Sequence, residues 1–223
     1  MMKPMKRFLA LLFLAASPSL AFDNLFDFNF GRGLPMSELQ AGGSSDHAGS
    51  LGTAWSADLL HMARPGLYVG LGGGQFRSND NESSTYLANA STIIRSRSSQ
   101  IMILTRQDLT YKPDAIPYVI EGIGWVQNSV VMTSRPNTTW ADTGTNEQRT
   151  LVHDTNNTVG FAIGAGMDFN LTNALFAGAE VRYQRALNEN FKTTPAGLAA
   201  TGQSDFDTPL KTLFYTVKLG LRY

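Results

Sequence analysis

The chain has 223 residues, no cysteine, and 18 basic residues balanced by 18 acidic ones. This length suits one domain or one β-barrel, and the lack of cysteine excludes a fold held by disulfides. The balanced charge offers no concentrated basic surface, which argues against a nucleic-acid partner.

The N-terminus predicts a cleaved secretory signal over residues 1–21. Three basic residues precede an apolar run from Phe8 to Ala16, and small residues follow at positions 19–21. The run is far shorter than the ~20 residues of a spanning helix. Removal of the signal leaves 15 basic and 18 acidic residues, a net charge of −3. No second long apolar run follows, so entry into a membrane would require strands, because only helices and closed barrels satisfy their backbone in lipid.

Eight segments of the mature chain alternate apolar and polar residues with the period of two that is typical of strands. In chain order they are residues 26–30, 51–62, 67–76, 101–112, 116–127, 158–169, 175–184 and 212–223. The alternation is clearest in the last segment, where Leu213, Tyr215, Val217, Leu219, Leu221 and Tyr223 share one side. It is poorer in 116–127, where Glu121 shares a side with Val119, Ile123 and Trp125.

The connections between these segments alternate in length. Three are short turns, near 63–66, 113–115 and 170–174, and four are long and polar, about 32–49, 78–100, 128–157 and 187–209. Short turns at one end and long loops at the other are typical of outer-membrane barrels. The sequence therefore predicts an all-β fold over residues 22–223: a closed antiparallel eight-stranded transmembrane β-barrel with short periplasmic turns and long extracellular loops.

Two stretches of the chain resemble the small eight-stranded outer-membrane barrels, typified by the transmembrane domain of outer-membrane protein A. Residues 159–169 with 179–183 are similar to the penultimate hairpin of that family, and residues 217–223 are similar to its terminal strand. The resemblance implies that the barrel-assembly machinery reads Tyr215, Val217, Leu219, Leu221 and Tyr223, with a final Tyr where Phe is commoner. It also implies a Gram-negative outer membrane, with its lipid and lipopolysaccharide, as the location. A C-terminal peptidoglycan-binding domain is not expected.

Charged residues on the polar side of the strands predict an ion-paired lumen. An eight-stranded barrel leaves an interior just wide enough for side chains, and charges buried there have to pair. Six acids and four bases are expected to form this network: Asp27, Asp58, Arg106, Asp108, Glu121, Asp168, Glu180, Arg182, Lys218 and Arg222. We interpret it as a structural plug, with a proton or ion path as the alternative. Glycines on the same side, such as Gly72, Gly164 and Gly166, would make room for the long side chains.

Aromatic residues near predicted strand ends are expected to anchor the barrel at the membrane interfaces. They are Trp55, Tyr111, Tyr118, Tyr183, Tyr215 and Tyr223. His47, His61 and His153 lie far apart without cysteine beside them, so neither a metal site nor a cofactor is expected. Neither His61 nor His153 heads the His-x-Ser pair of lipid A deacylase barrels, and outer-membrane proteases have ten strands and longer chains. We therefore do not expect an enzyme.

The predicted function is that of a structural and surface-interaction protein, with a plugged lumen and with recognition of a host or surface ligand through the long loops. Three alternatives remain at this stage. One is a small channel or transporter for small or hydrophobic molecules, another is a lipid-modifying enzyme, and the third is a soluble eight-stranded binding barrel with the two faces exchanged.

Overall fold

The computed structural model describes residues 24–41, 44–47, 49–83, 90–110, 114–140, 143–207 and 210–223. The predicted signal at 1–21 and Tyr111 lie outside these residues. Eight long strands form the body of the protein: β1 (Asn24–Pro35), β4 (Ser50–Arg64), β5 (Leu67–Asn79), β7 (Ala90–Asp108), β8 (Ala115–Pro136), β9 (Arg149–Asn170), β10 (Leu175–Ala186) and β13 (Lys211–Arg222). Short elements lie between them: β2 (Glu38–Ala41), β3 (Ser44–His47), β6 (Asn81–Ser83), β11 (Asn190–Lys192), α2 (Pro195–Thr201) and β12 (Asp205–Asp207).

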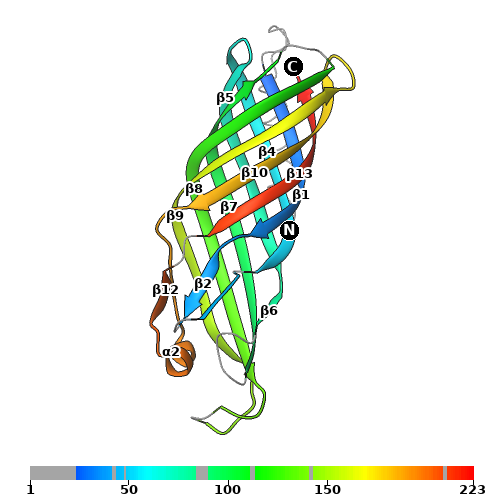
Figure 1. Cartoon of the computed structure of the whole chain (residues 1–223). Coiled ribbons are helices and arrows are strands. Elements are labelled where there is room, and N and C mark those ends of the chain that lie inside the picture. Colours follow the sequence, from blue (N-terminus) through cyan, green and yellow to red (C-terminus); the bar gives the residue numbers. More distant parts are fainter. Residues whose placement is uncertain are drawn as a thin grey trace, which may run out of the picture.

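The eight long strands close into an antiparallel barrel (Figure 1). Each pairs with its neighbours in the chain, β1 pairs with β13, and the β5–β7 ladder completes the ring. Closure leaves no unpaired edge in the barrel wall, as a sheet inside lipid requires. The predicted fold class is thus confirmed, and each of the eight predicted segments falls mainly in a different strand, although 101–112 runs past the end of β7 at Asp108.

Three strands continue well beyond the barrel wall at the long-loop end. β7 has 19 residues and β8 and β9 have 22 each, whereas β1, β10 and β13 have 12 each. The long polar connections predicted at 78–100 and 128–157 therefore consist largely of strand over their described residues. Polar composition suggested loops there, but an antiparallel hairpin outside the membrane can be polar on both faces because water solvates them.

The short elements gather beside these extensions (Figure 1). β11 pairs with β12, and α2 between them packs against β9. Thr194 caps the N-terminus of α2, where its hydroxyl accepts a hydrogen bond from the Gly197 amide. None of the described helices is long and apolar enough to cross a membrane.

The barrel has an apolar outer face and a mixed interior. Large apolar side chains such as Leu71, Ile101 and Ile163 are exposed on the outside, and Val217 is 66% exposed. Tyr215, Leu219 and Leu221 are exposed in the same outward row of β13, and Tyr223 ends it half-buried. An outward apolar band with filled space inside is the arrangement of a membrane barrel.

Candidate functional site

Asp168 is the centre of an ion-pair cluster at the short-turn end of the lumen. Its carboxylate oxygens lie 2.7 Å from Arg106 Nη2 and 3.0 Å from Lys218 Nζ, and 3.9 Å from Arg222 Nη2. Arg106 Nε also contacts Asp108 Oδ1 at 2.8 Å, and Lys218 Nζ lies 3.4 Å from Asp27 Oδ2. Arg106 is 0% exposed. Charges buried this deeply are stabilised only when each has a close opposite charge, as all of these have.

A second cluster is centred on Arg182 of β10. Its guanidinium lies between two carboxylates, with Nε 2.6 Å from Glu180 Oε1 and Nη2 2.7 Å from Asp58 Oδ2. Tyr118 connects the two clusters: its hydroxyl donates to Glu180 Oε2 at 2.9 Å. Its ring lies 3.8 Å from the Arg106 guanidinium and 4.2 Å from Lys218 Nζ. The structure thus joins nine of the ten predicted residues, and we call these nine the lumenal network.

Glu121 is the exception, and its prediction as a lumenal residue was wrong. Its side chain is exposed on the outer face of β8, between Thr105 of β7 and Ile163 of β9 in the ladders. Faces alternate strictly along a strand, so Glu121 has to share the side of Val119 and Ile123. Charge alone had suggested the interior; the period of two decides the face.

Tyr118 was also misplaced, because it lies in the lumen and not at the membrane surface. It is 1% exposed and packs with apolar lumenal residues such as Leu104, Ile120 and Phe176. The lumenal side of β8 is largely apolar at this level, and Tyr118 carries no charge, so the pattern of charged residues does not indicate it. Its parity with Ile116 and Ile120, opposite to that of Trp125, was the signal that could have placed it inside.

Glycines make space for the network, as expected from the sequence. A Cβ added at Gly166 would overlap the Tyr118 hydroxyl, and one at Gly72 would overlap an Asp58 carboxylate oxygen. A Cβ at Gly164 would approach the Arg182 side chain. These positions need the smallest residue because the opposing side chains fill the lumen.

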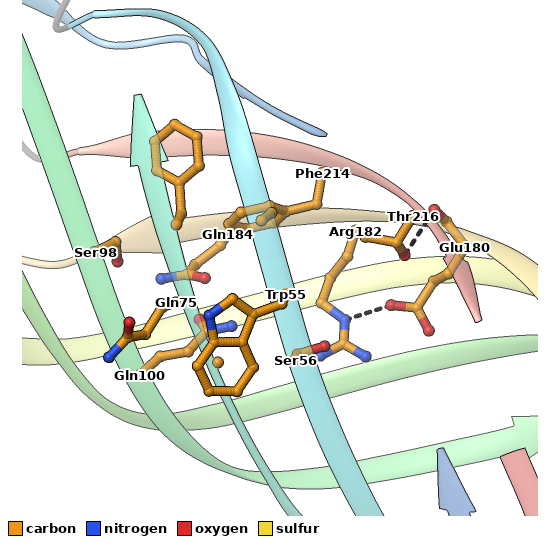
Figure 2. Close-up of a pocket in the computed structure, with 13 residues that line it drawn as sticks. Trp55, Ser56, Gln75, Ser98, Gln100, Glu180, Arg182, Gln184, Phe214 and Thr216 are labelled. Atoms are coloured by element: carbon orange, nitrogen blue, oxygen red, sulfur yellow. Dashed lines mark hydrogen bonds and ion pairs between the residues drawn. The ribbon is translucent and has the colours of Figure 1, made fainter. Parts of the chain in front are cut away.

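On the long-loop side of Arg182, the lumen contains a small cavity that is lined mostly by polar residues; Figure 2 shows this lining. Figure 2 shows Gln100, Gln184 and Ser98 on one side of it and Arg182 with Glu180 on the other. Phe76 and Phe214 meet edge to face at 5.8 Å in its wall. The ion pairs of Arg182 thus close the cavity on the short-turn side, and aromatic rings form part of its side wall.

A separate apolar core lies at the far end of the extended strands. Its buried residues are Ile94, Val130, Met132, Leu151, Val152, Phe191, Phe206 and Leu210. They come from β7, β8, β9, β11, β12 and the segment before β13. We call this unit, with α2, the loop-end lobe. A contiguous buried core indicates a folded unit, whereas a flexible loop has none.

Glu189 is buried where the lobe joins the barrel. It is 0% exposed; Asn128 Nδ2 donates to its Oε1 at 2.6 Å, and the Leu210 amide donates to its Oε2 at 2.7 Å. Burial raises the pKa of this carboxyl to about 7, although the two hydrogen bonds act in the opposite direction. The acid therefore ties β8 to the chain that enters β13.

His61 and His153, the two histidines whose side chains the structure describes, do not converge on a site. His61, near the short-turn end of β4, lies 2.9 Å from Asn24 Oδ1 through Nδ1. His153 is exposed on the extended part of β9. Among the residues that the structure describes, no group of three or more His, Cys, Asp or Glu side chains could hold a metal ion.

Comparisons with known proteins reveal likeness in structure but not in sequence. No protein-family model and no curated protein matches the chain. The outer-membrane protein OprG of Pseudomonas aeruginosa superposes with a TM-score of 0.51 at 13% identity, over 91% of this chain and 96% of that one. The outer-membrane protease OmpT of Escherichia coli gives 0.50 at 10% identity, over 93% and 99%. Neisserial surface protein A gives 0.48 at 8% identity, over 90% and 97%.

At these identities the likeness establishes the fold and no activity. OprG and OmpT also differ in what their names say of them, since OmpT is a protease. The chain therefore has the fold of the small outer-membrane β-barrels.

Proposed function

We propose that the protein is a non-enzymatic surface-interaction barrel of the Gram-negative outer membrane, which presents the loop-end lobe to the outside. The observation that carries the proposal is the lobe itself. Strands β7, β8 and β9 extend past the apolar band and cover a core of their own with β11, β12 and α2. An ordered projection of this kind presents a defined surface to a partner, and it does so from a rigid scaffold.

The lumenal network favours a barrel with a closed lumen and argues against a channel. Nine charged side chains and the Tyr118 ring cross the lumen at the short-turn end, held by contacts of 2.6 to 3.9 Å. A water-filled path would require several of these buried pairs to separate, and separating one such pair is costly. We therefore expect brief or no conductance in planar bilayers. Steady large conductance steps would overturn this part of the proposal and favour a channel.

Replacing the lobe tests its role in binding. Residues 190–207 would be exchanged for a short Gly-Ser linker, and cells that display either form would be tested for adhesion to cultured epithelial cells and to bare glass. The matched control carries the same Gly-Ser linker inserted at Asn173, in the short turn between β9 and β10. Both variants should still shift in electrophoresis on boiling, as folded barrels do, and only the lobe replacement should lose adhesion. Undiminished adhesion would refute a lobe-borne interaction.

A further inference from the structure

Three arginines, Arg77, Arg95 and Arg97, gather on the outer face of the barrel, directly on the long-loop side of the apolar band. On β5 the outward row passes from Leu71 and Gly73 to Gln75 and Arg77, and on β7 it passes from Ile101 to Ser99, Arg97 and Arg95. All three guanidinium-bearing residues line one open groove. Its other walls come from β4 and β8, so it crosses four adjacent strands. We call it the basic groove.

The register sets the like charges opposite one another. Arg77 pairs directly with Arg97 across the β5–β7 ladder, an arrangement that destabilises a sheet unless a counter-charge lies between the two side chains. Polar residues extend the row on both sides, since Thr53 is opposite Arg77 and Ser129 is opposite Arg97. Four neighbouring strands thus present hydrogen-bonding side chains at one level.

The protein neutralises only part of this charge. Asp80 makes a two-pronged contact with Arg95, at 2.5 Å to Nε and 2.8 Å to Nη2, and the pKa of Asp80 is lowered by that contact. Arg97 Nη2 donates to the neutral amide oxygen of Gln75 at 3.3 Å. Among the side chains that the structure describes, Asp80 is the acid paired with the groove. Within the described side chains, two positive charges of the groove therefore lack an acidic partner.

The position of the groove selects the kind of anion. Trp55 forms the border of the groove that faces the apolar band; it is 43% exposed and stacks on Phe28 with ring centroids 6.3 Å apart. Exposed apolar side chains such as Leu71 and Ile101 lie next to it in the band. A ligand that contacts both the basic groove and the apolar band carries a phosphate beside the arginines and acyl chains along the band. Arginine is suited to phosphate because its planar fork donates two parallel hydrogen bonds.

We propose that the basic groove binds the phosphorylated headgroup of an outer-leaflet lipid of the lipid A type. This inference rests on the proposed location, with the long-loop end facing outwards. The arginine pair Arg77–Arg97 holds a phosphate, Thr53 and Ser129 donate hydroxyl hydrogen bonds beside it, and Trp55 borders the acyl region. Further outward basic residues, Arg32, Arg185 and Lys211, lie just past the apolar rows of β1, β10 and β13 and extend the same preference around the barrel.

The test measures retained lipid on the intact, folded barrel by native mass spectrometry in detergent. The probes are hexa-acylated lipid A with two phosphates, the same lipid after removal of both phosphates, and the bisphosphorylated disaccharide without acyl chains. The test variant is Arg77→Gln/Arg97→Gln. The matched control is Arg135→Gln/Lys192→Gln, which removes equal charge from exposed positions in the extended strands and the lobe. A shift in electrophoresis on boiling first verifies that each variant forms a barrel.

The wild type and the control should retain bisphosphorylated lipid A, and the test variant should bind it at least about tenfold more weakly, since a charged hydrogen bond contributes enough for that. Removal of the phosphates should weaken binding to the wild type in the same way. Equal retention by the test and control variants would overturn the proposal in favour of diffuse attraction. Equal binding of the acyl-free disaccharide would overturn it in favour of a soluble polyanion. Either result leaves the adhesion test of the lobe independent.

Discussion

Glu121 places a carboxyl group among apolar side chains on the outward row of β8. The row runs Pro117, Val119, Glu121, Ile123 and Trp125, so the acid lies at its centre. Its flanking residues lie on β7 and β9 and include Thr105 and Ile163. A charge at the lipid-facing middle of a barrel costs free energy, less for Glu than the roughly 2–4 kcal/mol of Arg.

Replacing Glu121 with Leu should therefore stabilise the barrel by up to about 2 kcal/mol. The measurement is urea unfolding in phospholipid vesicles, and Gln127→Leu, at the border of the apolar row, is a control that should change stability little. If Glu121→Leu instead lowers stability or changes the oligomeric state, this face of β8 is covered by a partner and not by lipid.

Arg182 is the residue on which the second lumenal cluster depends. Arg182→Met removes the guanidinium that lies between Asp58 and Glu180, which should destabilise the barrel by about 3–5 kcal/mol. The triple variant with Asp58→Leu and Glu180→Leu removes the whole cluster and should recover much of the loss. Unfolding in urea compares the three proteins. A single variant as stable as the wild type would mean that the pairs contribute nothing.

At the scale of elements, the connection from β10 to β11 contains a pH-sensitive contact. The pKa of Glu189 rises from 4.5 in the unfolded chain to about 7 in the folded protein. The folded protein therefore keeps this proton where the unfolded chain has lost it, and stability falls as the pH rises from about 4.5 to 7. Ionisation should cost the lobe up to about 3 kcal/mol.

Hydrogen exchange at Phe206 and Leu210, corrected for the intrinsic rate, measures this loss. Protection should be highest near pH 5 and should decrease by pH 8, while amides in β10 stay protected. Glu189→Gln should abolish the pH dependence, and Glu147→Gln, at an exposed position, should leave it unchanged. A flat profile in the wild type would contradict a titration of Glu189 that weakens the lobe.

The two faces of β13 should tolerate charge differently. Val217 is 66% exposed on the outward row, so Val217→Arg places a cation in hydrocarbon at a cost of roughly 2–4 kcal/mol near the midplane. Thr216 borders the polar lumenal cavity, where Arg meets polar groups and should cost less. The yield of folding into lipid vesicles reports the difference, and equal losses would contradict the assignment of faces.

The strands of the barrel could be predicted from the sequence because one face of each is constrained by lipid. That constraint fixes a period of two, which is visible in the sequence of β9, β10 and β13. It ends where the strands leave the membrane: residues 128–134 and 149–156 have no continuous outward apolar row, yet they pair with each other, with one register shift between Met132 and Thr133. The core of the lobe joins residues as far apart as Ile94 and Leu210, and no local pattern indicates such a contact.

The candidate site, too, could be predicted only in part from the sequence. Charged residues on the lumenal parity predicted nine network members, because a narrow lumen obliges charges to pair. Tyr118 was missed since an aromatic ring can lie on either face, and Glu121 was misassigned since polarity was given more weight than parity. The arginines of the basic groove come together only through the register of β5 and β7, which the sequence does not state.

At the scale of the whole molecule, the barrel has three successive regions along its axis. Its short-turn end contains the buried ion pairs, its middle meets lipid, and its long-loop end presents the basic groove and the lobe. Closure of the barrel needs only the eight long strands, because the ladder is complete without β11, α2 and β12. The core of the lobe includes residues of β7, β8 and β9, which also form the barrel, so the lobe should not fold without these strands.

This arrangement requires the long-loop end to face outwards, and the absence of cysteine from the chain makes the orientation directly measurable. Asn146→Cys places a thiol at an exposed position between β8 and β9, and Asn173→Cys places one in the short turn between β9 and β10. On intact cells a membrane-impermeant maleimide should label only Asn146→Cys, because the outer membrane shields the periplasmic end. Permeabilised cells should label both, which verifies that each thiol is reactive. Labelling of Asn173→Cys alone on intact cells would invert the topology, and the basic groove would then lie at the inner leaflet, where it could not meet lipid A.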